Sequence, residues 1–261
     1  YADLLYVTCS SSCSSSISGQ YHSSWSIETI DAGDSFAPSI AIDSNDRLHI
    51  SYTGDSTQNL KYATCSYSCS TSSSWTKITI DAGSSPSSST YPIIRMIGPS
   101  IGVDSNGVKH IAYIENTQTN GWSSQRVVKY AKCSSSCTSA SSWTNATIAI
   151  GSTIDLDIDS NDEIHIIYRY STHYNHSKCS SSCLSNSSWS NTQINSQTSS
   201  GMHKIVIDLQ GNVHVANTHS NLKQLRYQTI SSSGVFYNFS ISPNLPSGMK
   251  IDGLTGEISG R

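Results

Sequence analysis

The chain has 261 residues, a formal net charge of −3 and a charged fraction of 13%, which is about half of the roughly 25% usual in soluble proteins. Its 15 Lys and Arg residues are scattered and form no basic run, which argues against nucleic acid or an anionic membrane as a partner. No apolar run approaches the length of a membrane-spanning helix, and the chain is long enough for one large all-β domain or two ordinary domains.

Short segments with alternating apolar and polar residues follow one another along the chain, and none shows a helical stripe. Residues 1–31 predict two strands. The best-preserved unit, 38–81, has an apolar strand ending in Asp, a tight turn, a strand containing His, the segment "LKYATC", a cysteine loop and "SWTKITID". The unit recurs in full at 99–150 and 151–196, and its first two strands recur at 202–220.

Four short antiparallel strands per unit of about 45 to 60 residues are typical of a β-propeller blade. We therefore predict an all-β fold, with a β-propeller of four four-stranded antiparallel blades over residues 1–224. The half blades 1–31 and 202–220 would complete each other and close the ring. An extended C-terminal β tail, 225–261, would then be surplus. If "LRYQTI" and "VFYNFSI" complete the last blade instead, five blades result.

The eight cysteines fall into four close pairs with none left over, which predicts four local disulfides and an extracellular protein. The pairs are Cys9 and Cys13, Cys65 and Cys69, Cys133 and Cys137, and Cys179 and Cys183. Zinc binding would need two loops to meet, and loops on separate blades diverge. Candidate N-glycosylation sites at Asn145, Asn175, Asn186 and Asn238 agree with a secreted protein.

Three residue types recur once per unit, and we interpret all of them as structural. An Asp before a Ser-Asn type turn accepts hydrogen bonds from its own turn. A His six residues later and a Trp on the fourth strand are expected to pack between strands or blades. Because equivalent residues of different blades lie far apart, we predict no metal site and no cofactor. The residues are Asp43, His49, Asp104, His110, Asp159, His165, Asp208, His214, Trp25, Trp75, Trp143 and Trp189.

Two parts of the sequence resemble known families. The turns "IDSNDRLHI", "VDSNGVKHI", "IDSNDEIHI" and "IDLQGNVHV" resemble the Asp-box repeats of sialidase-like propellers. The tail "SISPNLPSGMKIDGLTGEISG" resembles the end of immunoglobulin-like repeats on large surface proteins. The first resemblance implies glycosidase chemistry, with Arg95, Arg169 and Arg226 for an arginine cluster and Glu115 near by. The second implies an extracellular, modular and adhesive context.

The irregular connections are the other place where function is expected, because loops on a rigid scaffold commonly carry it. They concentrate residues that suit a sugar or protein ligand: Tyr91, Arg95, Glu115, Trp122, Arg126, Tyr170, His173 and Tyr174. Plain solvent-exposed loops are an equal alternative.

Three functions follow from these features. The first is a non-catalytic structural or interaction protein that assembles into a surface fibre or layer, with strands donated from residues 225–261 to a neighbouring copy. The second is a glycan-binding, lectin-like or adhesin-like propeller. The third is a sialidase-like glycoside hydrolase, for which no local motif assigns catalytic residues.

Overall fold

The structure is a computed structural model of the chain, and it describes residues 3–9, 25–83, 93–118, 124–195, 203–219, 224–230, 249–251 and 258–260. Nearly all of these residues lie in strands or tight turns. Three short 3-10 helices interrupt them: η1 (Ser72–Ser74), η2 (Ala140–Ser142) and η3 (Asn186–Ser188). No helix in the described part of the chain has the length and hydropathy needed to cross a membrane.

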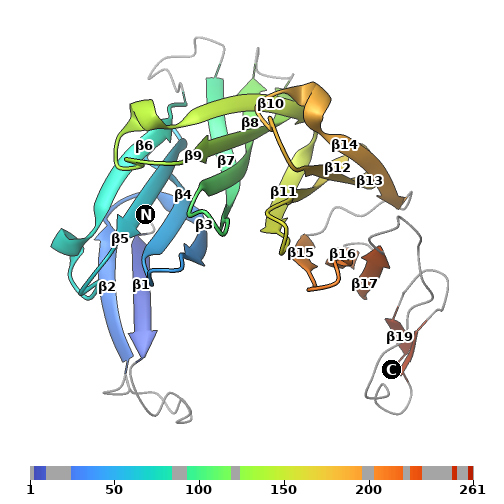
Figure 1. Cartoon of the computed structure of the whole chain (residues 1–261), viewed down its shortest axis with the longest axis horizontal. Coiled ribbons are helices and arrows are strands. Elements are labelled where there is room, and N and C mark those ends of the chain that lie inside the picture. The colour runs from blue at the N-terminus through green and yellow to red at the C-terminus, as the bar shows by residue number, and fades with distance from the viewer. Residues whose placement is uncertain are drawn as a thin grey trace. The chain divides into compact units, whose positions relative to one another are not determined.

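Three four-stranded sheets form complete blades, and within each the strands lie in chain order (Figure 1). We call the four strands of a blade a to d. The first blade is β3 (Ser35–Ile42), β4 (Leu48–Gly54), β5 (Asn59–Cys65) and β6 (Thr76–Asp81). The second is β7 (Ile93–Val103), β8 (Lys109–Gln118), β9 (Ser124–Cys133) and β10 (Thr144–Ile150). The third is β11 (Ser152–Ile158), β12 (Ile164–Tyr170), β13 (His173–Cys179) and β14 (Ser190–Asn195).

Sheets with fewer strands stand at the two ends of this series. At the N-terminal end β1 (Leu4–Cys9) pairs with β2 (Trp25–Asp31), and these strands correspond in sequence to c and d. At the other end β15 (His203–Ile207), β16 (Val213–His219) and β17 (Gln224–Ile230) correspond to a, b and c of a fourth blade. The predicted fold class, an all-β propeller with four blades, is confirmed.

The end of the fourth blade differs from the prediction. Strand β17 pairs with β16 along its whole length, from Gln224 opposite His219 to Ile230 opposite Val213. The predicted boundary after residue 224 is therefore wrong, because it cuts a strand that belongs to the blade. In the described part of the tail, β18 (Met249–Ile251) pairs with β19 (Ile258–Gly260), and β19 lies close to β17.

The chain divides into two compact units. The first comprises Tyr1–Lys109, Glu115–Gln125 and Lys132–Thr144, and the second comprises His110–Ile114, Arg126–Ala131 and Asn145–Arg261. In the first unit, an apolar cluster that includes Leu4, Ile50 and Trp75 joins β1 to the first blade. In the second, a cluster that includes Ile167 and Val215 joins the third blade to the fourth. Successive blades thus share apolar side chains, as expected when single sheets cannot bury their own faces.

Candidate functional site

The turn between strands a and b is built around one aspartate. The Oδ1 atom of Asp43 accepts hydrogen bonds from the backbone N–H groups of Asn45, at 2.9 Å, and Arg47, at 3.0 Å. Asp104, Asp159 and Asp208 accept the same two bonds in the later blades. Burial acts to raise the pKa of Asp43, but these hydrogen bonds and one with His49 outweigh it and lower the pKa. The carboxylate is thus held ionised by its own turn.

A histidine on strand b and a tyrosine on strand c extend this turn into the blade. His49 Nε2 lies 3.2 Å from Asp43 Oδ2, and His49 Nδ1 lies 2.6 Å from the hydroxyl of Tyr62. The fourth blade repeats the arrangement with Asp208, His214 and Tyr227, at 3.0 and 2.6 Å, and the second has His110 and Tyr130 at 2.6 Å. Burial lowers the pKa of His49 despite its bond to Asp43, so the imidazole is neutral at pH 7.

The recurring tryptophan connects one blade to the next. Trp143, at the start of strand d in the second blade, packs edge-on against Tyr62 of the first blade, with ring centroids 5.1 Å apart. The pairs Tyr6 with Trp75 and Tyr130 with Trp189 repeat this contact at 5.3 and 5.4 Å. Edge-to-face aromatic pairs of this kind contribute beyond the area they bury. Trp25 is different: it is 46% exposed.

The cysteine loops hold these tryptophans in position. The predicted disulfides Cys65–Cys69, Cys133–Cys137 and Cys179–Cys183 are confirmed, while Cys13 lies outside the described residues. The indole N–H groups of Trp75, Trp143 and Trp189 donate to the carbonyls of Cys69, Cys137 and Cys183, at 2.9 to 3.0 Å. A closed loop therefore presents a fixed acceptor to each tryptophan, which explains why the two motifs occur together.

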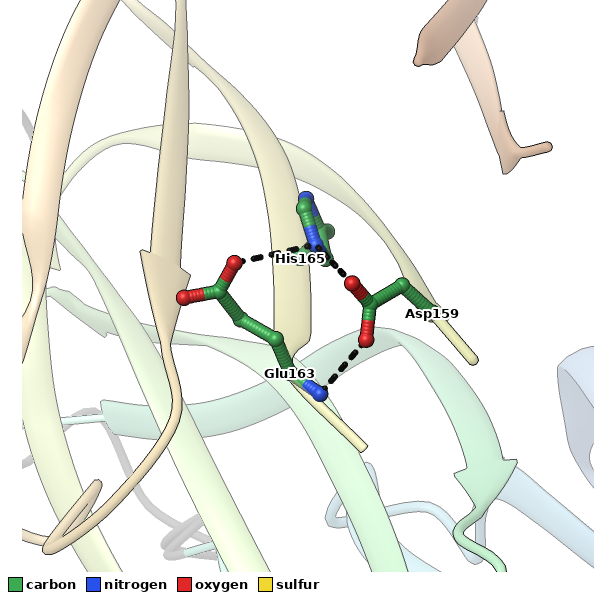
Figure 2. A group of neighbouring side chains, drawn as sticks. All are labelled: Asp159, Glu163 and His165. Atoms are coloured by element: carbon green, nitrogen blue, oxygen red, sulfur yellow. Dashed lines mark hydrogen bonds and ion pairs between the residues drawn. The ribbon is translucent and has the colours of Figure 1, made fainter. Parts of the chain in front are cut away.

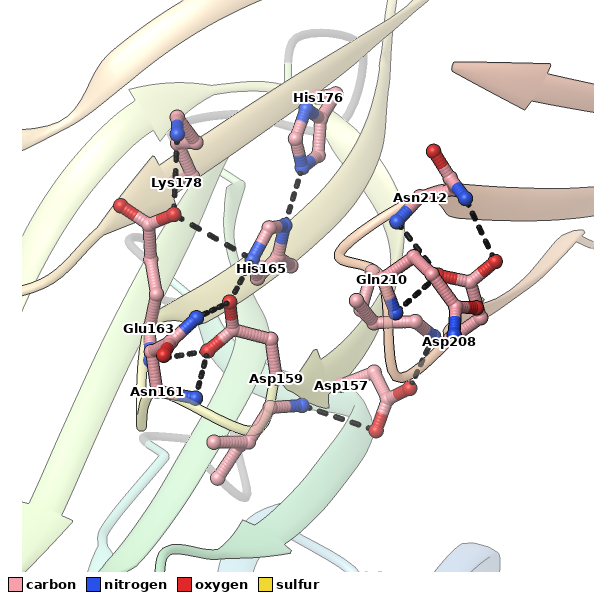
Figure 3. A network of polar contacts seen from close by, with 12 residues as sticks. Asp157, Asp159, Asn161, Glu163, His165, His176, Lys178, Asp208, Gln210 and Asn212 are labelled. Carbon is pink, nitrogen blue, oxygen red and sulfur yellow. Dashed lines mark hydrogen bonds and ion pairs between the residues drawn. The ribbon is translucent and has the colours of Figure 1, made fainter. Parts of the chain in front are cut away.

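The third blade departs from the repeat at one place (Figure 2). Glu163 follows the turn aspartate Asp159, and its Oε2 atom lies 3.7 Å from His165 Nε2. Asp159 Oδ2 lies 3.9 Å from the same nitrogen. On strand c the tyrosine is replaced by His176, whose Nε2 lies 2.9 Å from His165 Nδ1 (Figure 3). Two neighbouring imidazoles and two carboxylates thus meet where the first and fourth blades have a single Asp–His–Tyr chain.

The charges in this cluster are fixed by burial and hydrogen bonding. Burial, followed by the neighbouring His165, lowers the pKa of His176 to about 3, and burial also lowers the pKa of His165. For Asp159, burial acts to raise the pKa, but backbone hydrogen bonds from Glu163 and Asn161 outweigh it. In the described residues, Asp159, Glu163 and His165 form the group whose ligand atoms all lie within 4.8 Å of one another, close enough for a metal ion.

A second pair of acidic residues joins two blades rather than forming an open site. Asp155 on β11 accepts hydrogen bonds from the backbone N–H of Ile205 and from Lys204 Nζ, at 2.9 and 2.8 Å. Asp157 accepts one from the N–H of Ile207, at 2.7 Å, and burial raises its pKa. The two carboxylates on β11 therefore accept backbone N–H groups of β15, the first strand of the next blade.

The described candidate ligand residues of the irregular loops are divided between the two units. Tyr170 and His173 contact each other across the turn between β12 and β13, at 5.6 Å between ring centroids. Tyr174 is 1% exposed and packs against His203, so its assignment to an exposed face is wrong. Arg95 and Glu115 are half-buried in β7 and β8, and Arg126 is exposed in β9. Tyr91 and Trp122 lie outside the described residues.

The candidate glycosylation sites stay predictions. Asn145 and Asn186 are exposed, Asn175 is half-buried in β13 between two paired strands, and Asn238 lies outside the described residues. The arginine cluster implied by the sialidase resemblance also stays untested. Arg95 and Arg169 belong to different units, and the side chain of Arg226 is not among those described.

No protein-family model and no curated protein sequence matches the chain. Solved structures show likeness of fold. The chain is similar to a protein of unknown function from Dyadobacter fermentans, with a TM-score of 0.57 and 12% identity over 82% of this chain and 71% of that one. It is similar to a family 117 glycoside hydrolase from Zobellia galactanivorans, with a TM-score of 0.51 and 12% identity over 85% and 74%. It is similar to the NanB sialidase of Streptococcus pneumoniae, with a TM-score of 0.58 and 10% identity over 88% and 61%. Identities this low support a shared propeller fold and nothing finer.

Two elements of the site were missed by the sequence analysis. The tyrosine on strand c was signalled by its fixed place before the cysteine, in "LKYATC" and "VVKYAKC", and by the matching "LRYQTI". The cluster of Asp159, Glu163 and His165 was missed because a metal site was considered only between equivalent residues of different blades. Its signal was Glu163, the acidic residue that follows "DSND" in one turn where Arg47 stands in another.

Proposed function

We propose that this chain is a non-catalytic, extracellular interaction protein that assembles head to tail with further copies of itself. The proposal is supported by the two sheets at the ends of the series, which have two and three described strands where the complete blades have four. Local disulfides suit an oxidising environment. The acidic side chains that recur in the blades are engaged by backbone N–H groups, which suits a scaffold better than acid–base chemistry.

The single observation that carries the proposal is Trp25. Each of Trp75, Trp143 and Trp189 packs on the strand-c tyrosine of the preceding blade. Trp25 is the first residue of β2, in a sheet that has two described strands. Leu5, Val7 and Ile27 of the same sheet are each about half exposed. Together these side chains form an apolar face of the kind that monomeric proteins seldom leave uncovered.

The occupant we assign to this face is the fourth blade of a second copy. Strand β17 carries Tyr227 at the strand-c position, and its sheet has three described strands where complete blades have four. Docking β1–β2 of one copy on β15–β17 of the next would repeat the contact that already joins successive blades. Because the two surfaces differ, the contact is heterologous and propagates into a filament unless the rotation closes a ring.

The test is the mass and shape of particles formed by the full chain at increasing concentration. We expect light scattering and negative-stain microscopy to show oligomers or fibres that Trp25→Ala disperses. The matched control is Tyr67→Ala, because Tyr67 is an aromatic residue that is 81% exposed and belongs to neither β1 nor β2. A monomer at about 100 μM, or equal loss from both variants, would contradict the proposal.

A truncation after Ile230 separates two forms of the assembly. If fibres persist, the blade faces alone make the contact. If they disappear while Trp25→Ala has no effect, residues 231–261 donate the connecting strand, as part of the segment 225–261 that the sequence analysis expected to be donated. Strand β17 is already paired within its own chain, so residues 224–230 are not part of a donated segment.

Glycan binding is the second candidate, and one observation favours it. The fold is shared with a sialidase and a glycoside hydrolase, and Tyr170 is a 45% exposed aromatic residue beside His173, suited to stacking on a sugar ring. A glycan array with the full chain and Tyr170→Ala tests this. Signal that Tyr170→Ala removes would support it, and a fluorogenic sialoside assay on the same samples would show whether hydrolysis accompanies binding.

A further inference from the structure

The turn between β11 and β12 differs from the other three turns in a way that fits a metal ion. We propose that Asp159, Glu163 and His165 bind one first-row divalent cation, with Zn²⁺ as the preferred ion. The ligand atoms are the two carboxylate oxygens and the Nε2 atom of His165, and all lie within 4.8 Å of one another. In Figure 2 both carboxylates are directed at the imidazole edge that carries Nε2.

The Nε2 atom of His165 has no hydrogen-bond partner. His165 is 3% exposed, and Nε2 is buried. The carboxylate oxygens at 3.7 and 3.9 Å are too far away for a hydrogen bond. A buried nitrogen without a partner costs about 1–3 kcal/mol, and a lone pair facing two carboxylates is electrostatically unfavourable. A cation between the three atoms satisfies all of them.

His176 supplies the support that a metal-bound histidine requires. His165 Nδ1 lies 2.9 Å from His176 Nε2, so a second imidazole stands behind the ring as its hydrogen-bond partner. If Nδ1 of His165 donates this hydrogen bond, its Nε2 carries the lone pair and faces the carboxylates. Fixing the tautomer through the second ring nitrogen is the usual role of a partner behind a metal-bound histidine.

The carboxylate of Asp159 is also held in place. Its Oδ1 atom accepts hydrogen bonds from the backbone N–H groups of Asn161 and Glu163, at 2.9 and 2.8 Å. Its Oδ2 atom accepts a hydrogen bond from Asn161 Nδ2 at 3.3 Å and faces His165. Zinc binds nitrogen and oxygen at about 2.0–2.2 Å, so two ligands of a tetrahedral site stand roughly 3.4 Å apart. The observed 3.7 and 3.9 Å separations from His165 Nε2 exceed this by only a few tenths of an ångström, and the two carboxylate oxygens lie within 4.8 Å of each other.

The turns of the other blades lack the full set of residues that would bind a cation. Arg47, Val108 and Asn212 occupy the position of Glu163. The Nε2 atoms of His49 and His214 are hydrogen-bonded to their aspartates at 3.2 and 3.0 Å. The Nδ1 atom of each is hydrogen-bonded to a tyrosine hydroxyl. The third blade has both changes at once, an added acid and a histidine for the tyrosine. Imidazole with carboxylates favours zinc and its neighbours over Mg²⁺ or Ca²⁺, which prefer oxygen alone.

One cation already lies beside the cluster. Lys178 Nζ is 3.0 Å from Glu163 Oε2, the oxygen that faces His165 (Figure 3). The Lys178 side chain is 44% exposed, so it can move into solvent when an ion enters. We therefore expect Lys178 to weaken metal binding by competing for Glu163, and its removal to strengthen it.

The experiment is calorimetric titration of the full chain, first treated with EDTA and dialysed, with Zn²⁺ alone as the probe. We expect one saturable site per chain. Glu163→Gln should weaken it at least about tenfold, and the control Asp46→Asn, an exposed acid in the corresponding turn of the first blade, should leave it unchanged. Absence of saturable binding, or equal affinity in Glu163→Gln, would overturn the proposal and assign the gap to a water molecule.

Two further variants separate a metal site from a merely structural cluster. Lys178→Met should tighten zinc binding severalfold, whereas loss of a structural ion pair would only lower stability. His176→Phe should weaken binding by about 10–100-fold if it orients the ligand. Melting curves in EDTA check that each variant is folded. If Lys178→Met weakens binding and His176→Phe leaves it unchanged, the assigned geometry is wrong.

Discussion

At the scale of single residues, the tryptophan at the start of strand d connects three features that are separate in the sequence. Trp143 packs on Tyr62, donates to the carbonyl of Cys137, and is 7% exposed. The tyrosine in turn is bonded to His49, and burial raises its pKa to about 12, so its hydroxyl stays protonated. The contact between blades is therefore specific in geometry as well as apolar.

Trp143→Ala should lower the free energy of unfolding by about 3–5 kcal/mol, because it leaves a large cavity between two blades. Trp143→Phe keeps most of the packing but leaves a buried carbonyl unpaired, at about 1–3 kcal/mol. Urea denaturation measures both. A loss below about 1 kcal/mol for Trp143→Ala would show that the contact between blades does not depend on this ring.

At the scale of elements, the turn between strands a and b needs one residue with positive φ. Gly107 has φ +74°, and Gly211 has φ +78° at the equivalent position, while Asp46 and Asp162 have φ values of 58° and 62°. A Cβ atom added at Gly107 meets nothing within 4 Å. Gly107→Ala should therefore cost about 1 kcal/mol through backbone conformation alone, and Asp46→Gly should cost nothing. Equal losses in both variants, measured by thermal unfolding, would contradict this explanation.

The cysteine loop is the second element whose contribution can be measured. Closing a loop of five residues stabilises a fold by about 2 kcal/mol in the chain-entropy account. Replacing Cys133 and Cys137 together by Ala should cost about this amount. Replacing Cys65 and Cys69 should cost a similar amount, and the two losses should add because the loops belong to different blades. Strong non-additivity in urea titrations would show that the loops are coupled.

Most of the strands were predictable because alternation with a period of two survives in every blade, and an Asp with a His six residues later marks each a–b hairpin. The pairing of β17 was predicted only as an alternative, since "LRYQTI" lacks the cysteine that marks strand c in the complete blades. The Asp–His–Tyr chain joins residues up to 20 positions apart. Such contacts depend on register between strands, which a local pattern does not fix.

At the scale of the whole molecule, acid should act on the second unit first. His176 and His203 both belong to it, and burial lowers their pKa values to about 3 and about 4. For His203, the neighbouring Asp155 acts to raise the pKa, while Lys204 and Arg169 act to lower it. A histidine whose pKa is lower in the folded state than in the unfolded chain favours folding above its unfolded value of about 6.5. That stability is lost as the pH falls from there toward 3 to 4.

Each of these histidines should therefore remove up to about 1.4 kcal/mol of stability per unit of pH below 6. Urea titrations of the full chain at pH 7, 6 and 5, with EDTA present, measure this slope. His203→Phe, which keeps an aromatic ring against Tyr174, should reduce the slope by up to one proton. Protection of backbone amides in β11–β16 should fall before that in β3–β6. A free energy of unfolding that is constant from pH 7 to 5 would show that neither histidine is held neutral by burial.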